Sequence, residues 1–300
     1  MKKTWIPIVE RTVVLTVALL IAWSCKEDDQ NLSPEQAKAQ SKATAEDNAQ
    51  MVAASQEVLD ITSGAFAEQG VTDGRKLSEG RTETGGCKPL VSGTFNLDNS
   101  HPDSLIYSGT LTVDYGDGSS CPDSVKRQTG KIVDTFLYTL ATNSGIRFTS
   151  SENISFQGYR KDTIALDGTF IVKSATNQPT TLESQNAKLT YLDGTAASWD
   201  GILTFTYDKG DSRDWKDNSV SVTGSLSGTS REGAAFTAAI TKEIEYRYNC
   251  FKNKYKSFPV SGTIEVTTNG TLSTIDYGNG SCDKKYTIVT SGETTNLNLE

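Results

Sequence analysis

The chain alternates apolar and polar residues in a series of short runs, and this period of two constrains its fold more than any other feature. Glycine, aspartate and asparagine separate the runs. A period of two is typical of β-strands with one buried face. The runs are Leu105–Val113, Lys131–Leu140, Thr163–Lys173, Ile202–Tyr207, Val220–Leu226 and Val260–Val266. Because no convincing helical pattern follows Gly70, we predict an all-β, largely antiparallel meander that forms a sandwich or an open barrel.

A helical segment precedes this β-region. Ser33, Pro34 and Gln36 supply an N-cap, a first-turn proline and a capping-box glutamine. Apolar residues then recur along one face, which predicts one helix over about residues 34–69. Its apolar stripe is expected to pack on the β-domain of its own chain, with a partner helix as the alternative. Residues 70–86 are rich in glycine and polar residues and indicate a linker, which places the β-domain at residues 87–300.

The first 24 residues have the features of a secretory signal. Two lysines precede the apolar stretch Thr12–Trp23, which is too short for a membrane span of about 20 residues. The run LIAWSC, which ends at Cys25, resembles a bacterial lipobox, although Trp23 is larger than the residue usual there. The resemblance implies that Cys25 becomes the mature N-terminus and carries several acyl chains. The number matters because one acyl chain alone binds a membrane only marginally. An ordinary secretory signal or an uncleaved anchor is the alternative.

The residues directly after Cys25 also indicate where the protein is located. The segment Lys26–Asp29 is one lysine followed by three acids. It resembles the short signal by which Bacteroidota lipoproteins reach the outer face of the outer membrane. A solvated charge run at a chain terminus is the alternative. We therefore expect residues 25–86 to be a lipid-anchored tether in the outer membrane, with the protein facing outside.

Composition removes several classes of function. His101 is the only histidine, so a site with several histidine ligands is excluded. Ser100 and His101 share a loop without a base and an acid in triad order, and no GxSxG motif occurs. The net charge of −8 argues against nucleic acid, because binding phosphates needs a basic surface. We expect no catalytic residue, no metal ion, no cofactor and no nucleic-acid partner.

An internal repeat marks both ends of the β-region. Each copy runs from a cysteine through Ser-Gly-Thr to a tight turn, which is DYGDGSSC at residues 114–121 and DYGNGSC at residues 276–282. Such turns need glycine where the chain takes positive φ. With Cys25 carrying lipid, four cysteines remain and allow three pairings in an oxidising envelope. The repeat favours Cys87–Cys121 and Cys250–Cys282, each contributing roughly 3–4 kcal/mol by closing its loop.

Three segments, at residues 111–133, 220–241 and 260–283, resemble a group of uncharacterised Bacteroidota lipoproteins that share a terminal SGT…DYGxGxCD unit. The likeness covers most of residues 87–300 and includes the acidic helical segment. This chain departs from the group in the more basic residues Lys284 and Lys285 after the last turn. The resemblance implies a β-rich envelope protein and carries no activity to transfer.

The acidic turns have two interpretations. A calcium loop would use Asp114, Asp117 and Asp123, and in the second copy Asp276, Asn279 and Asp283. An EF-hand places a glutamate at its twelfth position, where this chain has Val125 and Thr287. Asp-Gly and Asn-Gly are ordinary hairpin signals, so we favour tight turns without a metal ion.

Two segments are candidates for binding a glycan. Tyr246–Phe258 mixes basic and aromatic residues, which would bind an anionic glycan by charge and stacking, or would protect an edge strand from aggregation. The acidic run Asp208–Asp217 holds a tryptophan that would stack on a sugar ring, or is a solvated hairpin loop. The candidate binding residues are Trp215, Arg247, Lys252, Lys254 and Tyr255.

These observations favour a non-catalytic, surface-exposed outer-membrane lipoprotein with a structural or binding role in the envelope. Its partners would be the membrane, through the lipid anchor, and a glycan or another envelope protein. The alternative is a carboxylate-based glycoside hydrolase or a glycan-binding module, because glycoside hydrolysis needs only a pair of Asp or Glu residues.

The lipid anchor is testable at one residue. A fatty-acid probe added to growing cells should label the wild-type protein and leave Cys25→Ala unlabelled, since only a cysteine thiol forms the thioether to diacylglycerol. Equal labelling of both proteins would contradict the anchor.

Overall fold

The computed structural model describes residues 32–68, 87–122, 127–142, 146–210, 217–250 and 258–298. The chain divides into two compact units, Met1–Gln36 and Ala37–Glu300. Helix α2 (Pro34–Glu68) begins in the first unit. There the Ser33 N–H donates to Gln36 Oε1 at 2.9 Å, and the Gln36 N–H donates to Ser33 Oγ at 3.3 Å. This reciprocal pair is the expected capping box.

In the described part of the second unit, thirteen strands form one sheet, and each strand pairs antiparallel with its neighbours in sequence. This meander confirms the predicted all-β, antiparallel fold with one N-terminal helix. It is a single open sheet and not a two-sheet sandwich, because a helix takes the place of a second sheet on its apolar face. The strands are β1 (Leu90–Asp98), β2 (Ser104–Gly116), β3 (Gln128–Ala141), β4 (Arg147–Lys161), β5 (Ile164–Ala175), β6 (Thr180–Thr190), β7 (Ala196–Asp208), β8 (Ser219–Thr229), β9 (Ala235–Arg247), β10 (Ser261–Thr268), β11 (Thr271–Asn279), β12 (Lys285–Thr290) and β13 (Glu293–Asn298).

Bulges bend this sheet into a trough. Register shifts interrupt most of the strand pairs from β2 to β11. At one of them Gly130 has φ 79°, and a Cβ there would lie 2.2 Å from the carbonyl oxygen of Gly158. A bulge adds a residue to one strand and increases its local bend and twist, so a series of bulges curls the whole sheet.

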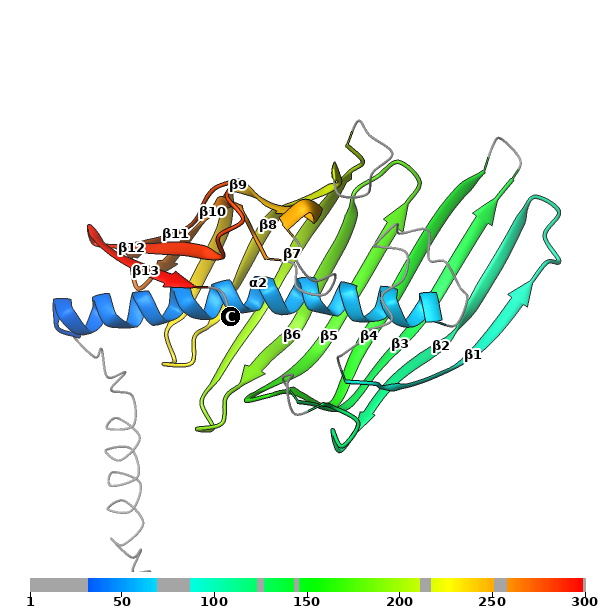
Figure 1. Cartoon of the computed structure of the whole chain (residues 1–300), viewed down its shortest axis with the longest axis horizontal. Helices are drawn as coiled ribbons and strands as arrows, with labels where there is room; N and C mark the ends of the chain where they lie inside the picture. The colour runs from blue at the N-terminus through cyan, green and yellow to red at the C-terminus, as the bar shows by residue number, and fades with distance from the viewer. Residues whose placement is uncertain are drawn as a thin grey trace, which may run out of the picture. The chain divides into compact units, whose positions relative to one another are not determined.

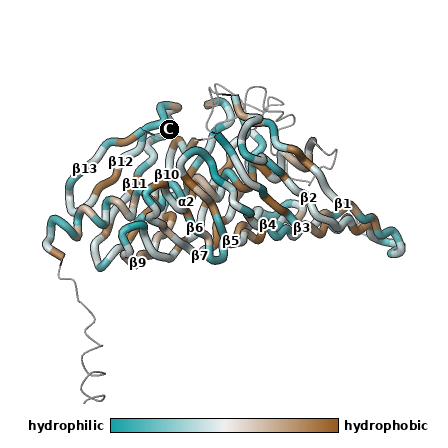
Figure 2. The backbone as a smooth tube through the Cα atoms, turned by 90° about the horizontal axis from the view of Figure 1, so that it is seen from below, coloured by the Kyte–Doolittle hydropathy of each residue, from teal (hydrophilic) through white to brown (hydrophobic). Residues whose placement is uncertain are grey.

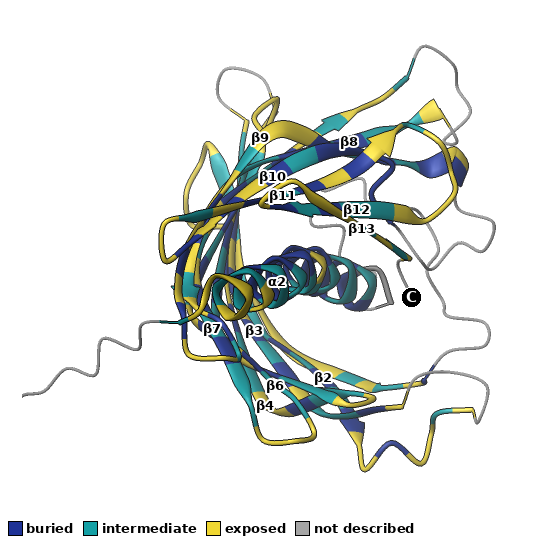
Figure 3. Cartoon of the chain, turned by 90° about the vertical axis from the view of Figure 1, so that its left-hand side faces the viewer, coloured by how far each residue is buried: buried dark blue, intermediate teal, exposed yellow. Residues whose placement is uncertain are grey.

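Helix α2 lies along the concave face of the trough (Figure 1). Its Lys38 bonds Glu293 of β13, and its Phe66 ring lies 5.1 Å from the Phe136 ring of β3. The helix rises about 42 Å between these two residues, and ten strand spacings cover about 48 Å. One helix is therefore long enough to cross almost the whole curled sheet. Seen end-on, the sheet surrounds it on most sides (Figure 3).

The core is the contact between this helix and the concave face. The strands alternate buried and exposed residues. Figure 2 colours the same strands by hydropathy, with hydrophilic and hydrophobic residues interspersed along the tube. The predicted apolar stripe of the helix packs on its own chain, with Met51 and Phe66 fully buried. Between Ser41 and Phe66 only Ala53 is exposed, so the polar side of the helix is covered too. No helix in the described residues combines the length and the apolar character that a membrane crossing requires.

A polar cluster fixes the helix to two turns at the rim of the trough. Asp47, fully buried, accepts hydrogen bonds from the N–H of Arg231 at 2.9 Å and from its Nε at 2.6 Å. The Tyr191 hydroxyl donates to Asp47 at 2.9 Å, and the Arg231 guanidinium lies 4.4 Å from the centre of the Tyr191 ring. Burial, and then the Asp47 charge, raise the pKa of Tyr191. These bonds satisfy a charge that would otherwise be costly inside the protein.

A second polar contact lies further along the helix. The Tyr159 hydroxyl donates to Glu57 at 3.1 Å, and Lys161 forms an ion pair with the same carboxylate at 2.7 Å. Tyr159 also accepts a hydrogen bond from Gln128 at 3.1 Å. Burial is the main cause of a raised pKa at Tyr159, so this hydroxyl stays protonated and remains a donor. The helix is thus held by polar contacts at two places about three turns apart.

Two disulfides close the repeat units. They join Cys87 to Cys121 and Cys250 to Cys282, the pairs that the repeat favours. The first pins the start of β1 to the end of β2, and the second pins the end of β9 to the end of β11. Each disulfide therefore lies beside a DYGxG turn, at the end of β2 in the first unit and at the end of β11 in the second.

The buried ion pair gives the first prediction for stability. Arg231→Met should lower the free energy of unfolding by about 3 kcal/mol, because it leaves Asp47 charged and buried without its partner. Lys131→Met is the control, since it breaks a partly exposed pair with Asp114 and should cost at most about 1 kcal/mol. Urea unfolding followed by tryptophan fluorescence measures both. Equal losses in the two variants would show that the Asp47 cluster does not fix the helix.

Candidate functional site

The predicted basic and aromatic patch turns largely inward where the structure describes it. Tyr246 and Tyr248 are buried at the end of β9, and Phe258 is buried in a small cluster with Cys250. These rings fill the protein interior and offer no stacking platform. Of the candidate binding residues only Arg247 lies in the described part of the chain; Trp215, Lys252, Lys254 and Tyr255 lie outside it, as does Cys25.

Arg247 is committed to contacts within the protein. Its guanidinium makes two hydrogen bonds to the Glu245 carboxylate, at 2.6 and 2.9 Å, and a third to the carbonyl of Gly280 at 3.3 Å. Ser261 donates to the same carboxylate at 3.1 Å. The hydrogen bonds from Arg247 lower the pKa of Glu245, so the pair stays charged on both sides. Arg247 therefore holds the second DYGxG turn and has its charge neutralised.

The two acidic turns have the geometry of tight turns. Asp114 and Asp276 each accept a hydrogen bond at 2.8 Å from the N–H of the residue two places on, Gly116 and Gly278. The ion-paired Lys131 is the largest cause of a lowered pKa at Asp114. In the described residues no three His, Cys, Asp or Glu side chains gather where they could share a metal ion. The carboxylates act on their own backbone, as Asx turns do.

A shallow hollow of about 490 Å³ lies beside the second turn, between that turn and the last two strands. Its wall includes Asp276, Asp283 and the Tyr286 ring. Asp283 accepts the N–H of Lys285 at 3.1 Å, so both acids already bond the backbone. The carboxylates of the turn that lines the hollow are therefore already used in hydrogen bonds within the protein.

The only histidine does not form a triad. The hydroxyl of Ser100 lies 3.4 Å from His101 Nδ1, and the carboxylate of Asp98 lies 3.8 Å from the same nitrogen. A triad needs the serine on one ring nitrogen and the acid on the other. Both groups here approach Nδ1 in an exposed loop, so the acid cannot orient the ring through one nitrogen while the other nitrogen takes the serine proton.

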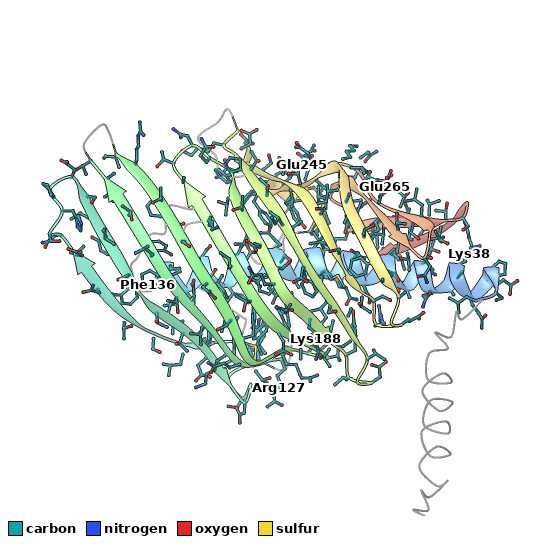
Figure 4. All side chains as sticks on the ribbon, turned by 180° about the vertical axis from the view of Figure 1, so that it is seen from behind. Lys38, Arg127, Phe136, Lys188, Glu245 and Glu265 are labelled. Carbon is teal, nitrogen blue, oxygen red and sulfur yellow. A yellow bond between two sulfur atoms is a disulfide. The ribbon has the colours of Figure 1, made fainter. Side chains whose placement is uncertain are left out.

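A groove on the convex face was not expected from the sequence. It has a volume of about 480 Å³ and crosses β7 to β10. Its floor consists of small exposed residues, and Asp200 and Glu265 stand at opposite corners; Figure 4 looks onto this face, with Glu265 labelled. The floor side chains are Ser225, Ser227, Thr237 and Ala239. The alternating small residues of β8 were the available signal, since a sheet face that lacks large side chains must be hollow.

The register explains the shape of the groove. Asp200, Ser227, Thr237 and Thr267 lie in one row across the four strands. The next row is Ile202, Ser225, Ala239 and Glu265. Asp200, Ile202 and Glu265 therefore stand at ends of the rows, and only serine, threonine and alanine lie in the middle. Asp200 is fixed by a hydrogen bond from the N–H of Asn186 at 2.6 Å.

Two further acids lie on the concave face. Asp134 of β3 faces Ile154 of β4, and Glu152 is two residues from that position. Each is 1% exposed. An acid at a core-facing position breaks the period of two in the Lys131–Leu140 run, so the sequence did carry a sign of Asp134.

Comparison with protein-family models, with curated proteins and with solved structures found no match to this chain.

The tight-turn interpretation predicts how Asp276 responds to substitution. Asp276→Asn should leave stability nearly unchanged, because an amide oxygen can still accept the Gly278 N–H. Asp276→Ala should cost about 1 kcal/mol. Millimolar calcium should shift the melting temperature of none of the three proteins in a thermal unfolding experiment. A calcium-dependent rise in the wild type that Asp276→Asn removes would instead indicate a cation site.

Proposed function

We propose that this protein is a non-catalytic lipoprotein of the outer membrane, anchored through Cys25 and facing outside. Its role is to bind an extended ligand at the cell surface or to form part of the envelope. The short leader, the lipobox-like LIAWSC run and the acidic residues after Cys25 support the location. The leading ligand classes are a glycan and another envelope protein.

The observation that carries this proposal is the filled trough. A curled sheet usually offers its concave face as a pocket, but here helix α2 packs against that face from β13 to β3. The convex groove is shallow and open, and it is built from strands. A shallow face on a rigid scaffold suits binding of an extended chain better than enclosure of a small substrate.

The chemistry of the convex groove favours a ligand with many hydroxyl groups. The floor offers the hydroxyls of Ser225, Ser227 and Thr237, each of which can donate and accept. The carboxylates of Asp200 and Glu265 accept hydrogen bonds at either end. A sugar chain presents donors and acceptors along its whole length and would meet these groups in turn.

The hydrolase alternative receives less support from the same residues. Glycosidases hold their two carboxyl groups about 5 to 9.5 Å apart. Asp200 and Glu265 stand three strand spacings apart, about 14 Å, and side chains on a convex face diverge. Asp134 and Glu152 are closer together, but at 1% exposure they do not reach a substrate.

The test is a glycan array combined with turnover assays on the same polysaccharides. Thr237→Trp fills the floor of the groove and should abolish binding. Thr206→Trp is the matched control, because Thr206 is an exposed threonine of β7 outside the groove. We expect binding by the wild type and by Thr206→Trp, with no product formed.

Each of the other possible results would lead to a different conclusion. Product formation that Asp200→Asn or Glu265→Gln stops would overturn the non-catalytic proposal. Binding that survives Thr237→Trp would move the site away from the groove. A failure of every glycan to bind would leave another envelope protein as the ligand class.

A further inference from the structure

The residues that line the convex groove include two acids and, in the described part of the chain, no base. The acids are Asp200 and Glu265, which stand at opposite corners and are both exposed. The other lining residues are serine, threonine, alanine, glycine and leucine. A ligand that enters the groove therefore meets two carboxylates and no cationic side chain.

The carboxylate of Asp200 keeps its charge for a ligand. The N–H of Asn186 donates to it at 2.6 Å, and a carboxylate has about four sites that accept hydrogen bonds. A lysine of β6, Lys188, faces Ser198, two residues from Asp200. On its other side, Lys188 directly faces the exposed Asp167 of β5. Opposed residues are closer than diagonal ones, so Asp167 is the acid that balances Lys188.

The surroundings of Glu265 are similar. It faces Ala239 of β9 on one side and Thr274 of β11 on the other, and neither is charged. One lysine of β9, Lys242, lies opposite the residue two places before Glu265. The exposed Glu243 follows Lys242 directly in the sequence. The lysine near each corner thus has an acid of its own, and the groove between the corners is negative.

We propose that the glycan bound in this groove carries positive charge, as a polysaccharide of amino sugars with free amino groups does. This inference rests on the proposed glycan binding and names the class of sugar. A protonated amine is both a cation and a hydrogen-bond donor, so it pairs with a carboxylate more strongly than a neutral hydroxyl does. The floor hydroxyls of Ser225, Ser227 and Thr237 would meet the hydroxyls of the sugar between the amines. Acidic sugars would be repelled.

The separation of the two acids favours a chain over a single sugar. Asp200 and Glu265 stand three strand spacings apart, about 14 Å. A single amino sugar reaches one of these corners, whereas a chain with an amine on every ring offers an amine to both. Binding at the first corner raises the effective concentration of amine at the second. Affinity should therefore rise with chain length until both corners are reached.

Calorimetric titration of the full chain in mild detergent tests the charge. A glucosamine hexamer and an N-acetylglucosamine hexamer share one backbone and differ in charge. The glucosamine hexamer should bind at least about tenfold more tightly at low salt, and added salt should reduce the difference. Asp200→Asn and Glu265→Gln should each weaken its binding about fivefold. Asp208→Asn is the matched control and should change nothing, because Asp208 is an exposed aspartate of β7 outside the groove.

The other results separate this inference from the proposed function. Equal binding of both hexamers, which Thr237→Trp abolishes, would overturn the charge preference and leave glycan binding in the groove standing. A failure of every glycan to bind would overturn both. Binding of the glucosamine hexamer that survives Thr237→Trp would be due to the net charge of −8 and would overturn the inference. Tighter binding of a lysine hexamer, lost in Thr237→Trp, would assign the groove to a basic peptide instead.

Discussion

The fold depends on covering one apolar sheet face with one helix. A single open sheet that is apolar on one side is unstable in water, and no second sheet is present among the described strands. Helix α2 supplies the cover, and the series of bulges lets the sheet curl far enough to meet it. Each part needs the other, because the helix carries buried polar groups such as Asp47 that only the rim turns satisfy.

This arrangement decides where function can lie. The concave face, which in an open sheet would be a natural pocket, is occupied by the protein's own helix. The binding that we propose would then use the convex face of the sheet.

The two repeat units show how far local sequence fixes local structure. In both copies the aspartate of DYG caps the turn and the tyrosine is buried. The first disulfide closes the β1–β2 hairpin, and the second joins the ends of β9 and β11, which lie on either side of β10. The Ser-Gly-Thr segments differ, however. Gly262 has φ 117° and forms a bulge, whereas Gly93 pairs regularly with Leu111. The strand of the second copy has a neighbour on each side, whereas in the described residues the strand of the first copy lies at the end of the sheet.

The sequence by itself determined the local features of this protein. The period of two indicated strands in parts of β2, β3, β5, β7, β8 and β10, and the Ser33 capping box marked the start of the helix. Strands such as β4 and β6 gave no clear signal, because serine, threonine and asparagine fill many of their core-facing and solvent-facing positions alike. These features depend on neighbours within a few residues, which the sequence contains directly.

Only the tertiary structure decided what lies inside and what lies outside. The sequence offered Arg247 and its aromatic neighbours either for binding or as protection of an edge strand, and in the structure Tyr246 and Tyr248 are buried and Arg247 is paired with Glu245. Nothing in the sequence indicated that Asp47 would be buried, and the alternating small residues of β8 were the single sign of the groove that crosses β7 to β10. Burial depends on contacts between residues more than a hundred positions apart, and the curl of the sheet sets those contacts. Composition and spacing do not reveal that curl. It is the sum of many small bends along the sheet and of the packing of the sheet on helix α2.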